Sequence, residues 1–209
     1  PTRSDTKRTI EPRGVTVKPG TYKVVLESKN ITSQTAVEIL IDPRLEISPE
    51  AIEERYDFAK KVEDFTAKTT AAVEQLKASK KTLAVYKKRI QEKDDEAHKV
   101  LLETIEEHSK KIEDILVLFI GKEDKRQGIV RNSENSVLKR IYSANRYVRS
   151  RPSGITLTEE KLLEHARQDL VAALDQTNAF YEVYWKAIRV QIEAINLSEF
   201  EAIKRFKLD

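Results

Sequence analysis

The side chains in this sequence that could bind a metal ion or move a proton are, first of all, three histidines: His98, His108 and His165. On one helix, His98 and His108 would lie about 15 Å apart at about 1.5 Å per residue, too far to share a metal ion. The sequence contains no HExxH motif and no two histidines spaced four residues apart. We therefore expect partly solvated histidines at the edge of a helical core, and no metal site.

Neighbouring carboxylates could supply the acid and the base of a glycoside hydrolase. Such pairs occur at Glu53-Glu54, Asp94-Asp95 and Glu106-Glu107, all in lysine-rich surroundings. Carboxylates and lysines mixed on a helix usually form a solvated ion-pair surface, and no apolar cleft that would raise a pKa is predicted. The G-x-S-x-G motif, phosphate-binding glycine loops and kinase signatures do not occur, and there is no cysteine. We expect no catalytic residue and no cofactor.

Positive charge is concentrated in residues 121–151, where nine Lys and Arg stand against three acidic residues. With tyrosines between them, these side chains could bind nucleic acid or another acidic polymer. A solvated end of a helical bundle explains the same charges, so nucleic acid is the less expected partner. The candidate interaction residues are Lys122, Lys125, Arg126, Arg131, Arg140, Arg146, Tyr147, Arg149 and Arg151.

The densest aromatic cluster is Phe180, Tyr181, Tyr184 and Trp185. Tyr181 and Trp185 could form a platform for a sugar ring, provided that Trp185 is exposed. Phe180 and Tyr184 fall on the predicted apolar stripe of a helix, which favours core packing for the cluster as a whole.

The elements that position these side chains are mainly helical. The chain has 209 residues, 39% hydrophobic and 35% charged, with a net charge of +3, so it can bury a core in one or two domains. Five glycines and six prolines allow few turns, which excludes an all-β sandwich or barrel over the whole length. The longest apolar run, residues 115–120, has six residues, whereas a transmembrane helix needs about 18.

The first 47 residues differ from the rest. Residues 1–13 are polar and predict a loose N-terminal segment, and residues 14–47 predict a β-hairpin whose connecting turn is residues 29–33. Apolar residues alternate at Val15 and Val17, then in residues 22–26 and again in residues 37–41, until Pro43 ends the second strand. A lone hairpin is marginally stable in water. This one therefore needs cover, either from the helices or from further strands, and we favour further strands.

The period changes at residue 48, and residues 48–209 predict helices. Ser48, Pro49 and Glu50 form a helix start, and an a/d repeat continues to about Lys93. The apolar seam of this helix is Phe58, Val62, Phe65, Thr69, Ala72, Leu76, Ser79, Leu83, Tyr86 and Ile90.

Three further helices and a short tail helix over residues 199–206 are predicted. The second helix ends before Gly121, the third lies within residues 134–150, and the fourth starts at Thr158. Their seams are His98, Leu101, Ile105, His108, Ile112, Ile115 and Phe119; then Val137, Leu138, Ile141, Tyr142, Asn145 and Val148; then Leu163, Ala166, Leu170, Ala173, Thr177, Phe180, Tyr184, Ala187, Gln191 and Ile195.

These seams predict a mainly α fold: an elongated, coiled-coil-like antiparallel three-helix bundle, up-down-up, with the residue 134–150 helix at one end. A homodimeric coiled coil is the alternative. Because the seams mix Ala, Ser and Thr with Leu and Phe, they predict close packing without a ligand cavity.

Four stretches together resemble a known family. They resemble the C-terminal region of large secreted Bacteroidota proteins that carry a sortilin-like propeller of the BNR/Asp-box type and are often labelled glycosyl hydrolases. The match runs in order from about residue 14 to residue 201. Its stretches are Pro19–Leu26, Ile41–Arg44, Gly121–Ile129, and Phe180-Tyr181 through Trp185 to Asn196–Phe200.

The resemblance implies that the hairpin ends an immunoglobulin-like domain, that a propeller lies upstream, and that the protein is secreted or in the cell envelope. No functional residue of that family falls on this chain. The expected function is a non-catalytic C-terminal structural or interaction module, acting as scaffold, spacer or assembly surface. Its expected partners are the propeller and immunoglobulin-like domains, another protein or a second copy. Two alternatives remain: an accessory carbohydrate-binding part of a glycoside hydrolase, and a basic module that binds nucleic acid or an acidic polymer.

Overall fold

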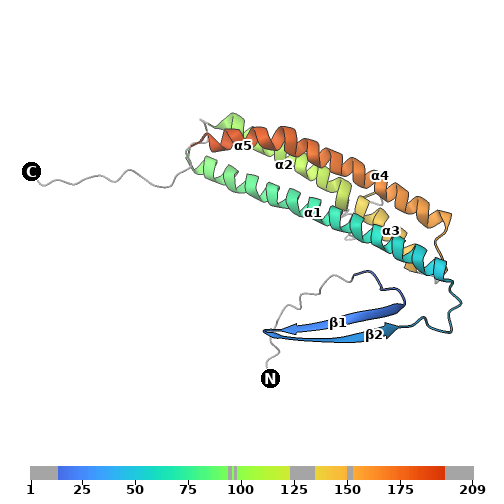
Figure 1. Cartoon of the computed structure of the whole chain (residues 1–209). Helices are drawn as coiled ribbons and strands as arrows, with labels where there is room; N and C mark the ends of the chain where they lie inside the picture. The colour runs from blue at the N-terminus through green and yellow to red at the C-terminus, as the bar shows by residue number, and fades with distance from the viewer. Residues whose placement is uncertain (1–13, 94–95, 97, 123–134, 150–152, 196–209) are drawn as a thin grey trace, which may run out of the picture.

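The longest element of the chain is a single helix, and the other helices pack along it (Figure 1). The computed structural model describes residues 14–93, 96, 98–122, 135–149 and 153–195. In chain order the elements are β1 (Gly20–Ser28), β2 (Ile31–Ile39), α1 (Pro49–Lys93), α2 (Lys99–Ile120), α3 (Val137–Arg149), α4 (Leu157–Ala179), a π-helical segment η2 (Phe180–Trp185) and α5 (Lys186–Glu193).

Helix α1 starts and runs as predicted. The Ser48 hydroxyl accepts the backbone N–H of Ala51 at 3.2 Å, and Pro49 is the first helical residue. Of the ten predicted seam residues, eight are buried, and Phe65 and Tyr86 are half-buried.

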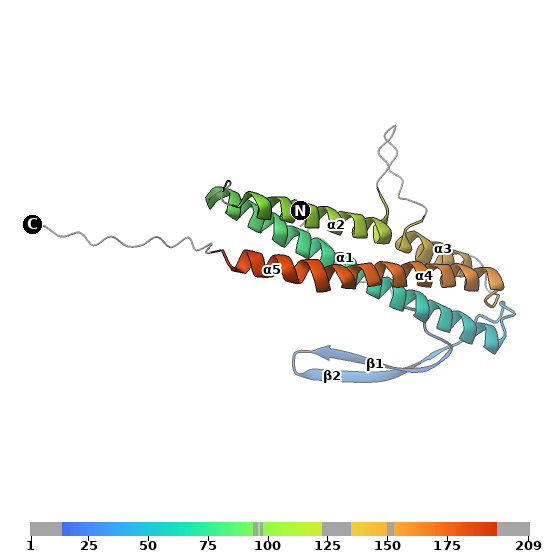
Figure 2. The ribbon, with the colours of Figure 1, turned by 90° about the horizontal axis from the view of Figure 1, so that it is seen from above.

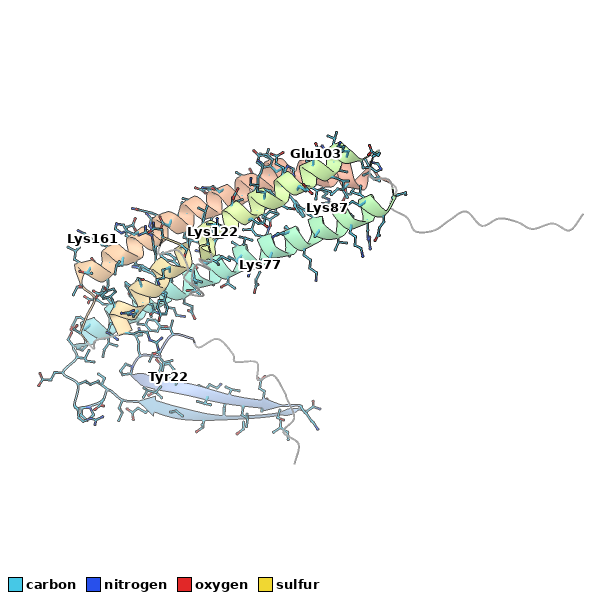
Figure 3. All side chains as sticks on the ribbon, turned by 180° about the vertical axis from the view of Figure 1, so that it is seen from behind. Tyr22, Lys77, Lys87, Glu103, Lys122 and Lys161 are labelled. Carbon is cyan, nitrogen blue, oxygen red and sulfur yellow. The ribbon has the colours of Figure 1, made fainter. Side chains whose placement is uncertain are left out.

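The bundle is antiparallel, as predicted. Helices α2 and α3 run back along α1 one after the other, and α4, η2 and α5 return along all three (Figures 1 and 2). Their apolar side chains form one core cluster, with Leu76, Ile112 and Ile188 fully buried. One chain thus builds this bundle from its own helices. Charged side chains cover the outer faces; Lys77, Glu103 and Lys161 are labelled in Figure 3.

The helix termini agree with the prediction at Gly121 and differ from it at α4. Gly121 follows α2 with a φ of 77° and donates its N–H to the carbonyl of Val117. Helix α4 starts at Leu157, one residue earlier than expected, because Thr156 and Glu159 form a capping box in which the Glu159 carboxylate accepts the Thr156 N–H at 2.9 Å. The spacing Thr-x-x-Glu, rather than Thr158 beside two acids, marks this start.

The predicted seam of the last long helix is correct up to Phe180 and wrong at the next three positions, whereas Ile195 is half-buried against the core as predicted. Ile188 and Ile192 are buried, whereas Tyr184 is 40% exposed and Gln191 is exposed. The cause is η2: a π-helical segment adds one residue to a turn and shifts every later residue by one position on the helix surface. The short helix α3 also buries Ala144 in place of Tyr142, which is 61% exposed.

The hairpin is confirmed as two antiparallel strands, with pairs running from Gly20 opposite Ile39 to Ser28 opposite Ile31. Its turn is only Lys29 and Asn30, shorter than expected. Lys29 has a φ of 52°, the sign that the first central residue of a two-residue hairpin turn requires. Val15 and Val17 precede β1 without strand pairing to any described residue, and Ile41 lies beyond β2.

Within the described residues, no helix is long and apolar enough to cross a membrane. The predicted N-terminal segment, residues 1–13, and the predicted tail helix lie outside them.

Candidate functional site

The two faces of the hairpin differ in chemistry. Residues that face each other across an antiparallel ladder project to the same side of the sheet. The register therefore puts Tyr22, Val24 and Leu26 of β1 on one side together with Ile31, Val37 and Ile39 of β2, and we call this side the apolar face. The opposite side, the polar face, carries Thr21, Lys23, Val25, Glu27, Thr32, Gln34, Ala36 and Glu38.

Most of the apolar face is open to solvent. Its exposed fractions are 49% at Val24, 68% at Leu26, 74% at Ile31 and 43% at Val37. Large apolar side chains gathered on one face and left exposed make this face the candidate interaction surface. The sequence predicts most of this face but misses Ile31, because Ile31 was assigned to the turn. A two-residue turn at Lys29-Asn30 would have placed Ile31 in the second strand.

A polar contact network joins the base of the hairpin to α1. Lys18 pairs with Glu53 through both carboxylate oxygens, at 2.8 and 3.0 Å, and its ammonium lies 4.7 Å from the ring centroid of Tyr56. The hydrogen bond from Lys18 to Glu53 raises the pKa of the lysine. The Tyr22 hydroxyl donates to the Lys18 carbonyl at 2.8 Å. The apolar face is therefore turned toward α1 at its Tyr22 end, where Figure 3 labels that residue.

A groove of about 960 Å³ lies between the segment before β1 and α1. Its walls include Val15, Val17, Ala59 and Ala67, and Arg55 also lines it. The Arg55 guanidinium donates to the carbonyls of Val148 at 2.9 Å and Ser153 at 3.2 Å, so it stabilises the end of α3. These contacts assign the arginine a structural role.

The predicted carboxylate pairs lie in surface ion pairs and caps. Glu53 binds Lys18, Glu54 accepts the N–H of Ile155 at 3.2 Å, and Glu106 pairs with Lys87. Glu107 pairs with Lys111 at 2.9 Å. The third pair, Asp94-Asp95, lies outside the described residues, and the described part of the chain contains no group of three or more His, Asp or Glu that could hold a metal ion.

The expectation of partly solvated histidines is wrong for His108. This side chain is 6% exposed, its ring centroid lies 5.4 Å from that of Tyr184 and 6.2 Å from that of Phe180, and its Nδ1 has no hydrogen-bond partner among the described residues. Burial lowers the pKa of the imidazole, with a further lowering by Lys111 and an opposing effect of Glu107. His98 is half-buried and His165 is exposed.

The aromatic cluster surrounds the π-helical segment. Phe180 is buried at its centre, and the Tyr181 hydroxyl shares a hydrogen bond of 2.8 Å with the Ser79 hydroxyl. Trp185, the proposed sugar platform, is half-buried with its ring centroid 5.9 Å from that of Tyr181. It borders a small groove of about 250 Å³ beside Tyr86 and Ile188. Only part of the indole is thus available to a ligand, and the sugar platform stays a prediction.

The described members of the basic candidate surface lie on α3 and just after the end of α2. Arg140 forms an ion pair with Asp169 of α4, whereas Arg146, Tyr147 and Arg149 are exposed on α3. Lys122 follows the end of α2 and is exposed (Figure 3). The remaining candidates lie outside the described residues: Lys125, Arg126, Arg131 and Arg151.

Comparisons with known proteins find no similar protein. No family model matches the chain, and no curated protein or solved structure is significantly similar to it. The candidate site with the clearest physical basis is therefore the exposed apolar face of the hairpin.

Proposed function

We propose that this chain is a non-catalytic structural and interaction module, in which a helical bundle carries a β-hairpin whose apolar face binds another β-structured part. The observation that carries the proposal is the contrast between the two units. The helices bury their own seams against one another, whereas the hairpin leaves Leu26 and Ile31 more than two-thirds exposed. Burying such side chains against a partner releases their free energy of transfer from water.

The surroundings of the carboxylates support a role without catalysis. Glu106 and Glu107 pair with lysines on exposed helix faces, and such pairs lack the desolvation that would tune a general acid. The groove beside α1 is flanked by Lys18 and Arg55, which already bind Glu53 and backbone carbonyls.

The sequence resemblance suggests the setting of the module. In that setting it follows a sortilin-like propeller in a secreted or cell-envelope bacterial protein, and the strands of an immunoglobulin-like domain cover the apolar face. A two-stranded sheet with one apolar face is the physical feature that such an arrangement needs.

The proposal is tested by placing charges on the apolar face. The double substitution Leu26→Lys and Ile31→Lys should shift the thermal midpoint of the helical signal by less than about 2 °C, because nothing described in the chain packs on these side chains. Leu83→Lys is the positive control, since Leu83 is 1% exposed and its substitution buries a charge.

Circular dichroism at 222 nm measures both variants. A midpoint lowered by more than about 5 °C in the hairpin variant would show that the apolar face belongs to the chain's own core, and the proposal would then be wrong.

A further inference from the structure

We propose that the outer edge of β1 pairs antiparallel with β1 of a second copy, so that two hairpins form one four-stranded sheet in the order β2-β1-β1-β2. This edge is distinct from the apolar face, so the inference goes beyond the proposed function and does not depend on what covers that face. Among the described residues, no backbone hydrogen bond joins β1 to any element other than β2.

The short turn decides which backbone groups point outward. Ser28 and Ile31 flank the two-residue turn, so they form a hydrogen-bonded pair, and such pairs alternate along the ladder with pairs that do not bond each other. Every second residue of β1 therefore directs its N–H and C=O away from β2. These residues are Thr21, Lys23, Val25 and Glu27.

The charges on these outward positions are self-complementary. If Val25 pairs with Val25 of the second copy, Lys23 stands opposite Glu27 of that copy, and Glu27 stands opposite its Lys23. Both side chains are exposed and neither forms an ion pair with another described residue. The ladder would contain about six hydrogen bonds between the copies, two for each of these pairs.

Neighbouring registers lack this match. Centring the pair on Lys23 or on Glu27 puts like charges opposite each other, which is unfavourable. Centring it on Val24 or Leu26 pairs neither charge with an opposite one. One register alone therefore satisfies both the backbone and the charges.

The edge of β2 offers no such match. Its outward residues are Thr32, Gln34, Ala36 and Glu38, which include one acid and no base. Two β2 strands could pair their backbones, but no register would bring opposite charges together. The charge pattern thus selects β1.

In Figures 1 and 2, β1 lies nearer to the helices than β2 does, so the second hairpin would pair on the side of β1 that faces the bundle. Figure 1 shows the hairpin joined to the helices at one end, with its turn pointing away from the start of α1. A twofold axis normal to the sheet keeps the apolar faces of both copies on one side, with Val24 of one copy next to Leu26 of the other.

Sedimentation equilibrium of the whole chain tests the inference, with charge exchange as the first set of variants. The unmodified chain should form a reversible dimer that becomes detectable as its concentration is raised to about 0.5 mM. Lys23→Glu and Glu27→Lys should each weaken the dimer about tenfold, because like charges then face each other. The double variant, Lys23→Glu with Glu27→Lys, should restore the affinity to within about threefold, since the pairs reform with exchanged signs.

A matched pair of prolines separates the two edges. Val25→Pro removes an outward N–H of β1, and Gln34→Pro removes an outward N–H of β2 at the position directly opposite. Neither amide bonds the other strand, so the β1–β2 ladder remains. Val25→Pro should abolish the dimer, and Gln34→Pro should leave it unchanged.

A chain that stays monomeric up to about 0.5 mM would overturn the inference. So would a dimer that is lost with Gln34→Pro, or one that resists both Val25→Pro and the single charge reversals. None of these outcomes bears on the proposed function, whose test is the melting midpoint of the apolar-face variant.

Discussion

At the scale of single residues, His108 shows how a seam position can bury a polar group. The heptad spacing places it on the core side of α2, but its burial depends on the rings of Phe180 and Tyr184, which lie more than 70 residues later in the chain. Sequence periodicity reports the side of a helix and not the size of what covers it. The position of His108 was therefore predictable, and its desolvation was not.

This environment predicts how stability depends on pH. Because the pKa of His108 is lowered from its usual value of 6.5 in the folded chain, the unfolded chain binds the proton first as the pH falls below about 7. The free energy of unfolding should therefore decrease as the pH falls through 6.5 and on to the folded pKa, while above pH 7 the histidine has no effect. The titratable groups that act on His108 or contact its ring are Glu107, Lys111 and Tyr184.

The measurement is chemical denaturation at pH 5 and pH 7. His108→Leu should reduce the loss of stability between the two values, because no imidazole remains to be protonated. His165→Leu, at an exposed position of α4, is the control and should leave the difference as it is. If His108→Leu lost as much stability between pH 7 and pH 5 as the unmodified chain does, the prediction would be wrong.

At the scale of elements, the π-helical segment is the feature that the sequence pattern concealed. Up to Phe180 the four-three spacing of α4 fits a regular helix, and continuing it gives an acceptable seam through Tyr184 and Ala187. The alternative seam through Ile188 and Ile192 is more apolar. One extra residue, inserted within η2, is enough to place these two isoleucines on the core side. The gain in burying two isoleucines explains the choice.

The extra residue predicts unequal effects of two single deletions. Val183 is 60% exposed within η2, and removing it should convert the segment to regular α-helix while Ile188 and Ile192 stay on the core side. We expect the free energy of unfolding to change by less than about 1 kcal/mol. Val171 is also exposed, at 45%, but lies in regular α4, so its deletion should rotate the flanking seam residues by about 100° and cost several kcal/mol.

Urea denaturation of the two deletion variants compares them directly. Equal and large losses of stability would show that η2 contributes a contact of its own, and that it does more than correct the register.

At the scale of the whole molecule, burial was predicted correctly where an element packs against other elements of the chain, and less well where it does not. The seam of α1 was predicted because helices on two sides pack against it, so that its apolar spacing reflects burial. The alternation in β1 was read as a strand with equal success, yet Val24 and Leu26 remain about half or more exposed, because alternation shows which residues share a face and not whether anything covers it. The apolar face was visible in the pattern, while its exposure required the fold.

Two units with so few shared contacts should open separately. Leu76 is fully buried among the helices, and Leu76→Ala should cost about 2–5 kcal/mol. The hairpin is attached to α1 chiefly through Lys18 and its contacts with Glu53 and Tyr56. Amides of α1, α2 and α4 should therefore lose protection against hydrogen exchange in this variant, whereas the Val24 and Leu26 amides, which bond β2, should exchange as before.

Native-state hydrogen exchange resolves the two units residue by residue. Leu26→Ala is the reciprocal variant: it should increase exchange in the hairpin and leave the bundle amides unchanged, because the Leu26 side chain is 68% exposed and the described helices leave it open to solvent. If both substitutions changed exchange in both units by the same amount, the hairpin and the bundle would fold as one cooperative unit. The apolar face would then contribute to the chain's own stability, and would not be a surface held ready for a partner.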